Sequence, residues 1–220
     1  KSMSLTTFTY ENGKYDRRNR TFYGFEKVVT EVRNPQTQAK LRYSVQKFLN
    51  DSFYTQGALI EQRSYDANDQ LLAVQSNFYN LVKPDLAHTA NFNTGSNHLY
   101  QASGLGEMDR TRASLLLVKT ATTEYEGNQS RNLVKHFKSF DKIGNILTYE
   151  DLGSSNSDAY LASITYKTDA VYQRLPINIE IRAKSTNELL KKRTAQYNNK
   201  GSLTQSVVYL ETNKTNRVQY

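Results

Sequence analysis

Apolar and polar residues alternate along several stretches of the chain. Residues 177–184 read Ile-Asn-Ile-Glu-Ile-Arg-Ala-Lys, and the same period of two recurs in residues 41–46 and 160–167. In a β-strand this period sends one set of side chains to a core face and the other set to water. The pattern therefore predicts antiparallel strands with one solvated face.

Short polar turns separate the expected strands. Asn-Pro-Gln-Thr at 34–37 links a strand at 22–33 to one at 40–49. Further turns follow a strand at 114–125 and join the strand at 177–184 to one at 189–197. Long strands joined by short links favour a meander. We expect an all-β fold of long antiparallel hairpins in a meandering, curved sheet, with little helix.

Two regions depart from the alternation. Residues 84–112 are rich in Asn, Gly and Ser, and they predict a long polar loop with one helical turn near Glu107–Ala113. Asp169 is a candidate cap for a second helical turn that ends at Arg174, before a proline. We expect an N-terminal hairpin lobe at 1–83, the loop at 84–112 and a β-meander at 113–220, or one continuous sheet.

One turn sequence recurs three times. Each copy has an aromatic residue, then Asp or Asn, and later an aliphatic residue that restarts the alternation. Two of the copies have Gly three positions after the Asp or Asn. The expected turn residues are Phe140, Asp141 and Gly144, then Tyr197, Asn198 and Gly201, and in a weaker copy Tyr65 and Asp66, with Asp69 in place of Gly.

The repeated residue types suit a hairpin loop. Asp or Asn accepts hydrogen bonds from main-chain N–H groups two residues on, which closes a type I turn. Gly then adopts the left-handed conformation of the bulge in a three-residue loop. The aromatic ring is expected to pack on the neighbouring strand. Asp69 tolerates the left-handed region less well than Gly does, so the third copy is weaker.

These turns resemble the YD, or RHS, repeat of bacterial RHS proteins, cell-wall-associated proteins, teneurins, and the B and C components of Tc insecticidal toxin complexes. Residues 175–204 resemble two strands of this repeat with their turn. Residues 10–25, which contain Tyr-Glu-Asn-Gly-Lys-Tyr-Asp and Phe-Tyr-Gly-Phe, are similar to a segment of the Tc toxin B component.

The resemblance implies a strip of sheet that belongs to a hollow shell around a polypeptide, often a toxin domain. It also implies a bacterial protein that is secreted or displayed at the cell surface. The expected partners are the remainder of a larger RHS-type polypeptide and its enclosed C-terminal domain. The family's self-cleaving segment with paired Asp-Pro elements is absent, because the three prolines follow Asn34, Lys83 and Leu175. The chain stops within strand-like sequence, and we expect it to be a piece of a longer protein.

The amino-acid composition limits the kinds of functional site that the chain can form. Hydrophobic residues make up 37% of the chain, and 16 Tyr and 9 Phe with no Trp supply much of the apolar area. The absence of Cys excludes disulfides, thiolate zinc sites and cysteine nucleophiles. The sequence has no apolar run of the roughly 20 residues that a membrane span needs. It also shows no apolar signal core near its start.

The formal net charge of +8 is spread along the chain. The densest groups are Arg17, Arg18 and Arg20, and then Lys191, Lys192 and Arg193. Charge runs usually lie on solvated faces, so we expect no nucleic-acid partner.

Candidate catalytic and metal-binding residues do not form a known constellation. The 3 histidines, at 88, 98 and 136, lack the spacing of a metal motif. Residues 104–106, Gly-Leu-Gly, lack the Lys-Ser/Thr of a phosphate loop. The carboxylate pairs Glu107 with Asp109 and Glu150 with Asp151 suggest solvated turns or loop ends more than a glycosidase pair. We expect no catalytic, cofactor-binding or metal-binding residues.

Three functions remain open. The first is a non-enzymatic structural segment of an RHS/YD-repeat-type shell. The alternative is a β-sheet binding module for carbohydrate or for another anionic or polymeric ligand, because many tyrosines can form a stacking platform. A hydrolase of cell-wall polysaccharide ranks last, since no catalytic constellation supports it.

Overall fold

The computed structural model describes residues 4–84, 86–92, 98–101, 113–155, 157–168, 173–211 and 214–219. Every regular element in these residues is a β-strand, and none of them is helical. The prediction of an all-β fold built from antiparallel hairpins is confirmed. The two helical turns expected near 107–113 and 169–174 lie mostly outside the described residues. The described part thus holds no helix that could cross a membrane.

Fifteen strands follow one another along the chain. They are β1 (Leu5–Asp16), β2 (Thr21–Arg33), β3 (Lys40–Leu49), β4 (Ala58–Asp66), β5 (Leu71–Val82), β6 (His88–Thr89), β7 (Leu99–Gln101), β8 (Ser114–Glu126), β9 (Gln129–Phe140), β10 (Ile146–Asp151), β11 (Tyr160–Tyr166), β12 (Pro176–Ala183), β13 (Leu189–Tyr197), β14 (Leu203–Glu211) and β15 (Lys214–Gln219).

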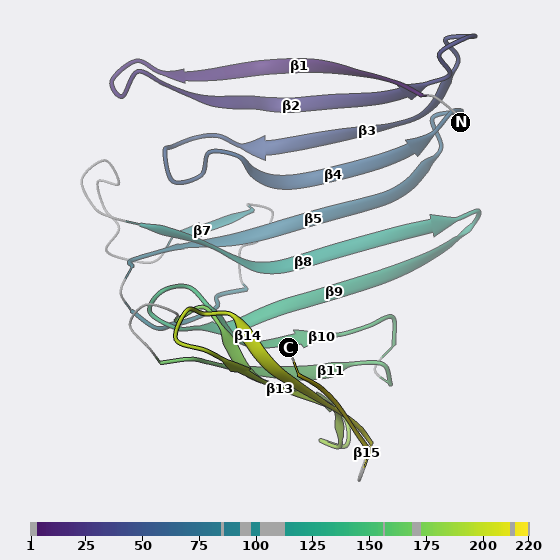
Figure 1. The fold of residues 1–220 in the computed structure, drawn as a ribbon. Helices are drawn as coiled ribbons and strands as arrows, with labels where there is room; N and C mark the ends of the chain where they lie inside the picture. The colour runs from purple at the N-terminus through teal and green to yellow at the C-terminus, as the bar shows by residue number, and fades with distance from the viewer. Residues whose placement is uncertain are drawn as a thin grey trace. The chain divides into compact units, whose positions relative to one another are not determined.

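Neighbouring strands follow the order of the chain. The hydrogen-bonded order is β1-β2-β3-β4-β5-β8-β9-β10-β11-β12-β13-β14-β15, while β6 pairs with β9 and β7 with β5 (Figure 1). The pairing of β5 with β7 is parallel, and the consecutive hairpins are antiparallel. This order is that of the predicted meander, interrupted only by the two short strands.

The chain forms two compact units. Unit 1 comprises Lys1–Lys83 and Asn91–Leu133, and unit 2 comprises Pro84–Ala90 and Val134–Tyr220. The division between them falls within β9. The sequence placed its candidate boundary in residues 84–112, and this stretch contributes residues to both units.

Several expected strands agree with the observed bounds to within one residue at each end. They are 22–33, 40–49, 114–125, 160–167, 177–184 and 189–197, which correspond to β2, β3, β8, β11, β12 and β13. The agreement is close because polar turn residues bound these strands on at least one side. A turn depends on a few consecutive residues, so its position can be predicted from the sequence alone.

Few side chains are fully buried. All eight residues of β12 are partly exposed, so the clean division into a buried and a wet face is absent there. The strands contact chiefly their hydrogen-bonded neighbours, which leaves both faces of a strand partly open to water. The buried hydrophobic residues of the described part are Ala58, Leu81, Val82, Leu116, Val118, Phe140, Ala159, Ala162 and Ala195.

The stretch expected to be a long loop contains two short strands. In unit 1, β7 lies beside β5, and the side chain of Asn80 fixes the segment before it. Its Nδ2 donates to the carbonyl of Asn91 at 2.9 Å, and its Oδ1 accepts from the Asn91 N–H at 2.7 Å. In unit 2, β6 pairs with the end of β9. The loop prediction was therefore too simple: polar residues here satisfy main-chain groups that are distant in sequence.

Candidate functional site

The predicted turn at Asp141 is a closed hairpin loop. The Asp141 N–H donates to the carbonyl of Asn145 at 2.9 Å, and the Asp141 carbonyl accepts from the Gly144 N–H at 3.1 Å. The Asp141 Oδ1 accepts from the N–H groups of Ile143 and Asn145 at 3.0 and 2.9 Å. Gly144 has a φ of 84°, in the left-handed region. These are the contacts of a type I turn with a glycine bulge.

The turn at Asn198 has the same scheme. The Asn198 N–H donates to the carbonyl of Ser202 at 3.0 Å, and its Oδ1 accepts from the N–H groups of Lys200 and Ser202 at 2.9 and 3.0 Å. Gly201 has a φ of 78°. An amide oxygen thus does in this turn what a carboxylate oxygen does at Asp141.

The third turn has Asp69 at the bulge position. Asp66 Oδ1 accepts from the N–H groups of Asn68 and Gln70, both at 2.8 Å. Asp69 has a φ of 64°, a region that costs an L-residue free energy. Its carboxylate forms an ion pair with Lys40, from the adjacent hairpin. This contact offsets part of the backbone cost that a glycine avoids.

The tyrosine before two of these turns contacts the strand that precedes its own strand in the sheet. The phenylalanine before the third turn is buried. Tyr65 of β4 stacks on Tyr43 of β3, with ring centroids 4.5 Å apart and planes 5° from parallel. The Tyr197 hydroxyl of β13 donates to the carbonyl of Pro176 in β12 at 3.1 Å. Phe140 is only 3% exposed and lies opposite β6. The two tyrosines therefore connect successive hairpins.

The sequence predicts the turns after β2 and β12, but it did not show that the two turns share one set of contacts. The β2–β3 and β12–β13 loops each have a left-handed residue, Gln38 with a φ of 57° and Asn187 with a φ of 58°. The carbonyl of each accepts a hydrogen bond from an arginine five positions earlier, Arg33 or Arg182, at 3.1 Å in both cases. The available signal is a Glu-x-Arg sequence at the end of both preceding strands.

The glutamate of the Glu-x-Arg sequence joins neighbouring strands by ion pairs. Glu180 lies 2.8 Å from Lys192 of β13 and 3.4 Å from Arg182. The hydrogen bond from Lys192 is the main reason that the pKa of Glu180 lies below its ordinary value. Glu61, in the same sequence pattern on β4, pairs with a lysine of β3 at 3.0 Å. Partly exposed pairs of this kind contribute at most about 1 kcal/mol each.

Glu150 and Asp151 are the last two residues of β10, whereas the sequence suggested a solvated turn or loop end. Glu150 is 7% exposed and forms ion pairs with Lys184 and, at 3.6 Å, with Lys138. Burial alone raises the pKa of Glu150, but the hydrogen bond from Lys184 and the two ammonium charges lower it overall. A carboxyl with a lowered pKa is ionised at neutral pH and is a poor general acid. The pair Glu107 and Asp109 lies outside the described residues.

The histidines belong to separate local contacts. The Nδ1 atom of His98 lies 2.8 Å from the carbonyl of Asn77, and its ring stacks on Phe78 at 4.9 Å. His88 lies in β6, and His136 lies in β9 opposite Glu150. Within the described residues, no group of three or more His, Asp or Glu side chains is arranged to hold a metal ion. Residues 104–106 lie outside this part of the chain.

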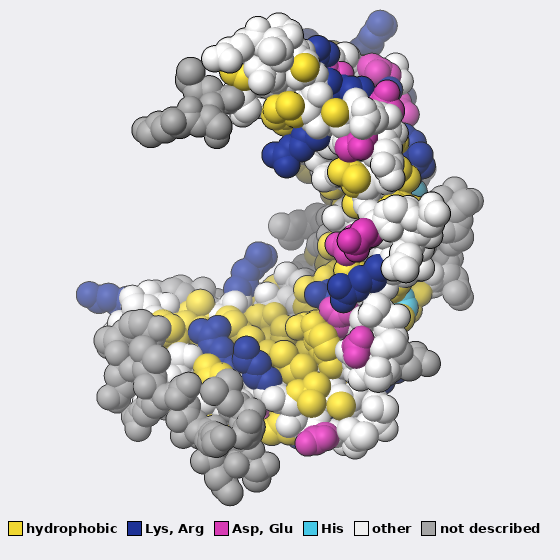
Figure 2. Space-filling view, turned by 90° about the vertical axis from the view of Figure 1, so that its right-hand side faces the viewer, with side chains coloured by type: hydrophobic (Ala, Val, Ile, Leu, Met, Phe, Trp, Pro, Cys, Tyr) yellow, Lys and Arg dark blue, Asp and Glu magenta, His cyan; other side chains and the backbone are white. Residues whose placement is uncertain are grey.

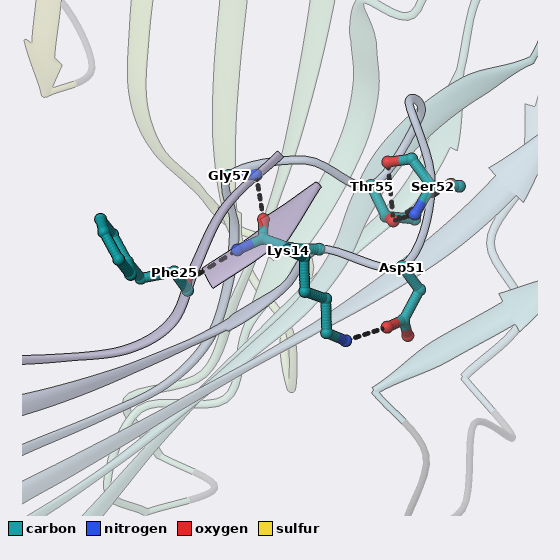
Figure 3. A network of polar contacts seen from close by, with 7 residues as sticks. Lys14, Phe25, Asp51, Ser52, Thr55 and Gly57 are labelled. Carbon is teal, nitrogen blue, oxygen red and sulfur yellow. Dashed lines mark hydrogen bonds and ion pairs between the residues drawn. The ribbon is translucent and has the colours of Figure 1, made fainter. Parts of the chain in front are cut away.

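The loop between β3 and β4 is clamped by one buried amide. Asn50 is 2% exposed; its Nδ2 donates to the carbonyl of Phe25 and its Oδ1 accepts from the N–H of Gly57, both at 2.7 Å. Thr55, 1% exposed, accepts at Oγ1 from the N–H of Ser52 at 3.0 Å (Figure 3). These contacts give the loop a defined shape against β2.

The loop between β1 and β2 is closed by Asp16. Its carboxylate accepts from the Tyr23 hydroxyl at 2.7 Å, from the Arg18 N–H at 2.8 Å and from the Asn19 side chain at 2.7 Å. The hydrogen bond from Tyr23 is the largest cause of the lowered pKa of Asp16. Both loops at this end of unit 1 are thus held by polar contacts.

Comparison with known proteins gives structural matches alone. No protein-family model and no curated protein matches the sequence. The TcdB2-TccC3 crystal structure without the hypervariable C-terminal region is similar to this chain, with 10% sequence identity and a TM-score of 0.61. The Photorhabdus luminescens Tc holotoxin pore is similar at the same identity and TM-score. Each match covers 93% of this chain and 15% of the solved chain.

These matches confirm the resemblance to Tc toxin components at the level of the fold. The chain spans about 15% of the length of the solved chains. An identity of 10% shows a shared fold and leaves function to be argued from the residues.

Proposed function

We propose that the chain is a non-enzymatic structural segment of an RHS/YD-repeat-type shell in a secreted or surface-displayed bacterial protein. The remainder of that polypeptide is its partner, and the shell encloses a C-terminal toxin or effector domain. The observation that carries the proposal is the fold match to Tc toxin structures over 93% of the chain.

The arrangement of strands and turns supports a structural role. Each long strand is hydrogen-bonded to the long strand before it, so the sheet can be extended by adding hairpins of the same kind. The loops after Asp66, Asp141 and Asn198 repeat one scheme of hydrogen bonds. A repeated turn suits a structural role, in which many similar hairpins build one sheet. An active site instead needs one particular set of catalytic side chains.

The contacts of the carboxylates support a non-enzymatic role. Glu150, Glu61 and Glu180 each pair with basic side chains. Such charges connect strands and hold them in register.

Limited proteolysis of the longer polypeptide tests the proposal. If this segment is part of an enclosing wall, trypsin will leave the C-terminal domain intact in the native protein. Replacing Gly201 with Pro breaks a turn of the wall, because proline cannot adopt its φ of 78°. The C-terminal domain should then be cut at least about tenfold faster. Equal cutting rates in the two proteins would show that the segment does not enclose that domain.

A further inference from the structure

The loops of unit 2 lie at two opposite ends of its strands. Because neighbouring strands from β9 to β13 are antiparallel, every second loop lies at the same end. The β9–β10 loop and the β11–β12 loop form one end, which we call the first rim, and the β12–β13 loop (184–188) belongs to the other end, the second rim (Figure 1). Strands β11, β12 and β13 have 7, 8 and 9 residues, so about 20–30 Å separate the two rims.

An open pocket lies in the first rim, between its two loops. Its volume is about 460 Å³, within the range of ligand sites. Aliphatic side chains and two lysines are among its lining residues: Ile143, Leu147, Ile164, Lys142 and Lys167. The pocket thus offers an apolar surface with positive charge beside it.

Hydrogen bonds hold the walls of this pocket in place. The Nδ2 atom of Asn145 donates to the carbonyl of Gln173 at 2.8 Å and so joins the two loops. The Tyr166 hydroxyl donates to the carbonyl of Ile146 at 3.1 Å. The carboxylate of Asp141, which also lines the pocket, accepts from two main-chain N–H groups and from Asn145 Nδ2. Its oxygens are therefore engaged within the turn, and the pocket is formed before an occupant enters.

The second rim presents two leucines beside a carboxylate. Leu189 and Leu190 are 42% and 47% exposed, and the exposed Glu188 precedes them. In the pairing of β12 with β13, Leu189 and Lys191 have partners on consecutive residues of β12, so Leu190 is the extra residue of a β-bulge. An exposed leucine of this kind can enter an apolar pocket while the neighbouring carboxylate pairs with a cation.

We propose that the pocket of the first rim receives Leu190 from the second rim of a second copy of this chain. Glu188 of that copy then pairs with Lys142, which is exposed and has no ion pair within the described residues. A second copy is the occupant that the charges favour, because the chain carries a leucine and a carboxylate at the rim that its own pocket cannot reach. The contact joins two different surfaces, so copies add head to tail. The proposal does not rest on the structural role, and either can fail without the other.

Sedimentation equilibrium of the 220-residue chain tests the association. The contact is small, so we expect a dissociation constant of roughly 0.1–1 mM. The average mass should rise with protein concentration without levelling off at the mass of a dimer. Added salt should weaken the association, because it screens the attraction between Glu188 and Lys142. A monomer mass at every concentration up to about 1 mM would overturn the proposal.

Substitutions at the two rims locate the contact. Leu190→Ser and Lys142→Glu should each weaken the association at least about fivefold. An equal mixture of the two variants should form pairs that stop at the dimer, because each variant keeps the rim that the other lacks. Lys142→Glu combined with Glu188→Lys restores the opposite charges and should recover the association.

The matched control is Leu41→Ser, since Leu41 is a 49% exposed leucine of β3 in unit 1. It should leave the association unchanged, and circular dichroism checks that every variant keeps the fold. Wild-type association of both Leu190→Ser and Lys142→Glu would assign the contact to another surface, such as the open edge of β1, and would overturn the proposal.

Discussion

At the scale of single residues, the hairpin loops of this protein depend on one side-chain oxygen and one left-handed residue. Asp141 and Asn198 use their Oδ1 atoms in the same way, to accept from two main-chain N–H groups. Gly144 and Gly201 then adopt φ values of 84° and 78°. Asp69 adopts 64° without the freedom of glycine. The turn thus tolerates a change of acceptor more easily than a change of backbone conformation.

The first prediction concerns Gly201. Gly201→Ala places a Cβ atom in the left-handed region and should lower the free energy of unfolding by about 1–2 kcal/mol. Urea unfolding followed by circular dichroism measures the change. Lys200→Ala, at the exposed neighbouring position, serves as the control and should alter stability far less. Equal stability of Gly201→Ala and wild type would mean that the bulge conformation is not required.

The second prediction concerns the clamp at Asn50. Asn50→Ala leaves the Phe25 carbonyl and the Gly57 N–H without their partner, and should cost about 2–4 kcal/mol of stability. Asp51→Ala removes only an exposed ion pair and should cost at most about 1 kcal/mol. The same urea experiment compares the two neighbours. If both variants lost the same small amount, the buried amide would have no special part in holding the loop.

The roles of some of these residues can be predicted from the sequence and those of others cannot, depending on whether their contacts are local. The turns at Asp141 and Asn198 can be predicted because the hydrogen bonds that close each loop lie within five consecutive residues. The clamp at Asn50 is invisible, because its acceptor Phe25 lies on another strand. A contact between polar groups that are distant in the sequence produces no repeating pattern from which it could be predicted.

At the scale of strands, ion pairs between side chains connect neighbouring strands. Lys27 of β2 pairs with Glu11 of β1 at 2.9 Å, and Lys192 of β13 pairs with Glu180 of β12 at 2.8 Å. In unit 2, Glu150 of β10 is the most enclosed of these groups. The face of unit 2 seen in Figure 2 gathers hydrophobic side chains, with basic side chains among them. Ion pairs between neighbouring strands thus add to the apolar contacts where side chains of the sheet remain partly exposed to water.

The third prediction is a dependence of stability on pH. The pKa of Glu150 is lower in the folded protein than its ordinary value of 4.5, because Lys184 and Lys138 outweigh the effect of burial. The pKa of Asp151 is also lowered: the N–H of Gly153, Tyr160 and Lys135 together outweigh burial. Carboxyls of this kind contribute stability above the unfolded-state pKa, and the contribution is lost as pH falls through the folded-state pKa.

Urea unfolding between pH 7 and pH 3 measures this dependence. Wild type should lose stability as the pH falls below about 4.5. Glu150→Gln should lose less over the same interval, because it has no proton to take up at that position. Leu161→Ala, a 37% exposed position on β11, is a control that should keep the wild-type slope. A slope in Glu150→Gln as steep as that of wild type would assign the pH dependence to other groups.

The strands themselves are the part of the fold that the sequence predicts best. Alternation at 177–184, and the turn that separates this stretch from the strand expected at 189–197, predict β12 and β13 almost residue for residue. Alternation does not report how a face is covered, and β12 has partly exposed residues on both faces. The two short strands β6 and β7 were missed because they have two and three residues, too few to show a period.

At the scale of the whole molecule, the strand order supports the proposed role as a segment of a shell. Among the described strands, β1 is hydrogen-bonded on one side only, to β2. It is 12 residues long, and Phe8 and Tyr10 on it are 55% and 52% exposed. A long open edge with exposed aromatic residues favours pairing with a further strand. The proposed shell role therefore requires that the sheet continues beyond β1 in a longer polypeptide.

Cryo-electron microscopy of the longer native polypeptide shows whether the sheet continues beyond β1. We expect a further strand hydrogen-bonded along the outer edge of β1, from Leu5 to Asp16, within a sheet that continues around an interior volume. Fast hydrogen exchange at those outer amides in the 220-residue chain, and slow exchange in the long polypeptide, would agree with it. A reconstruction in which β1 borders solvent and residues 1–220 stand apart from their neighbours would contradict the proposed shell role.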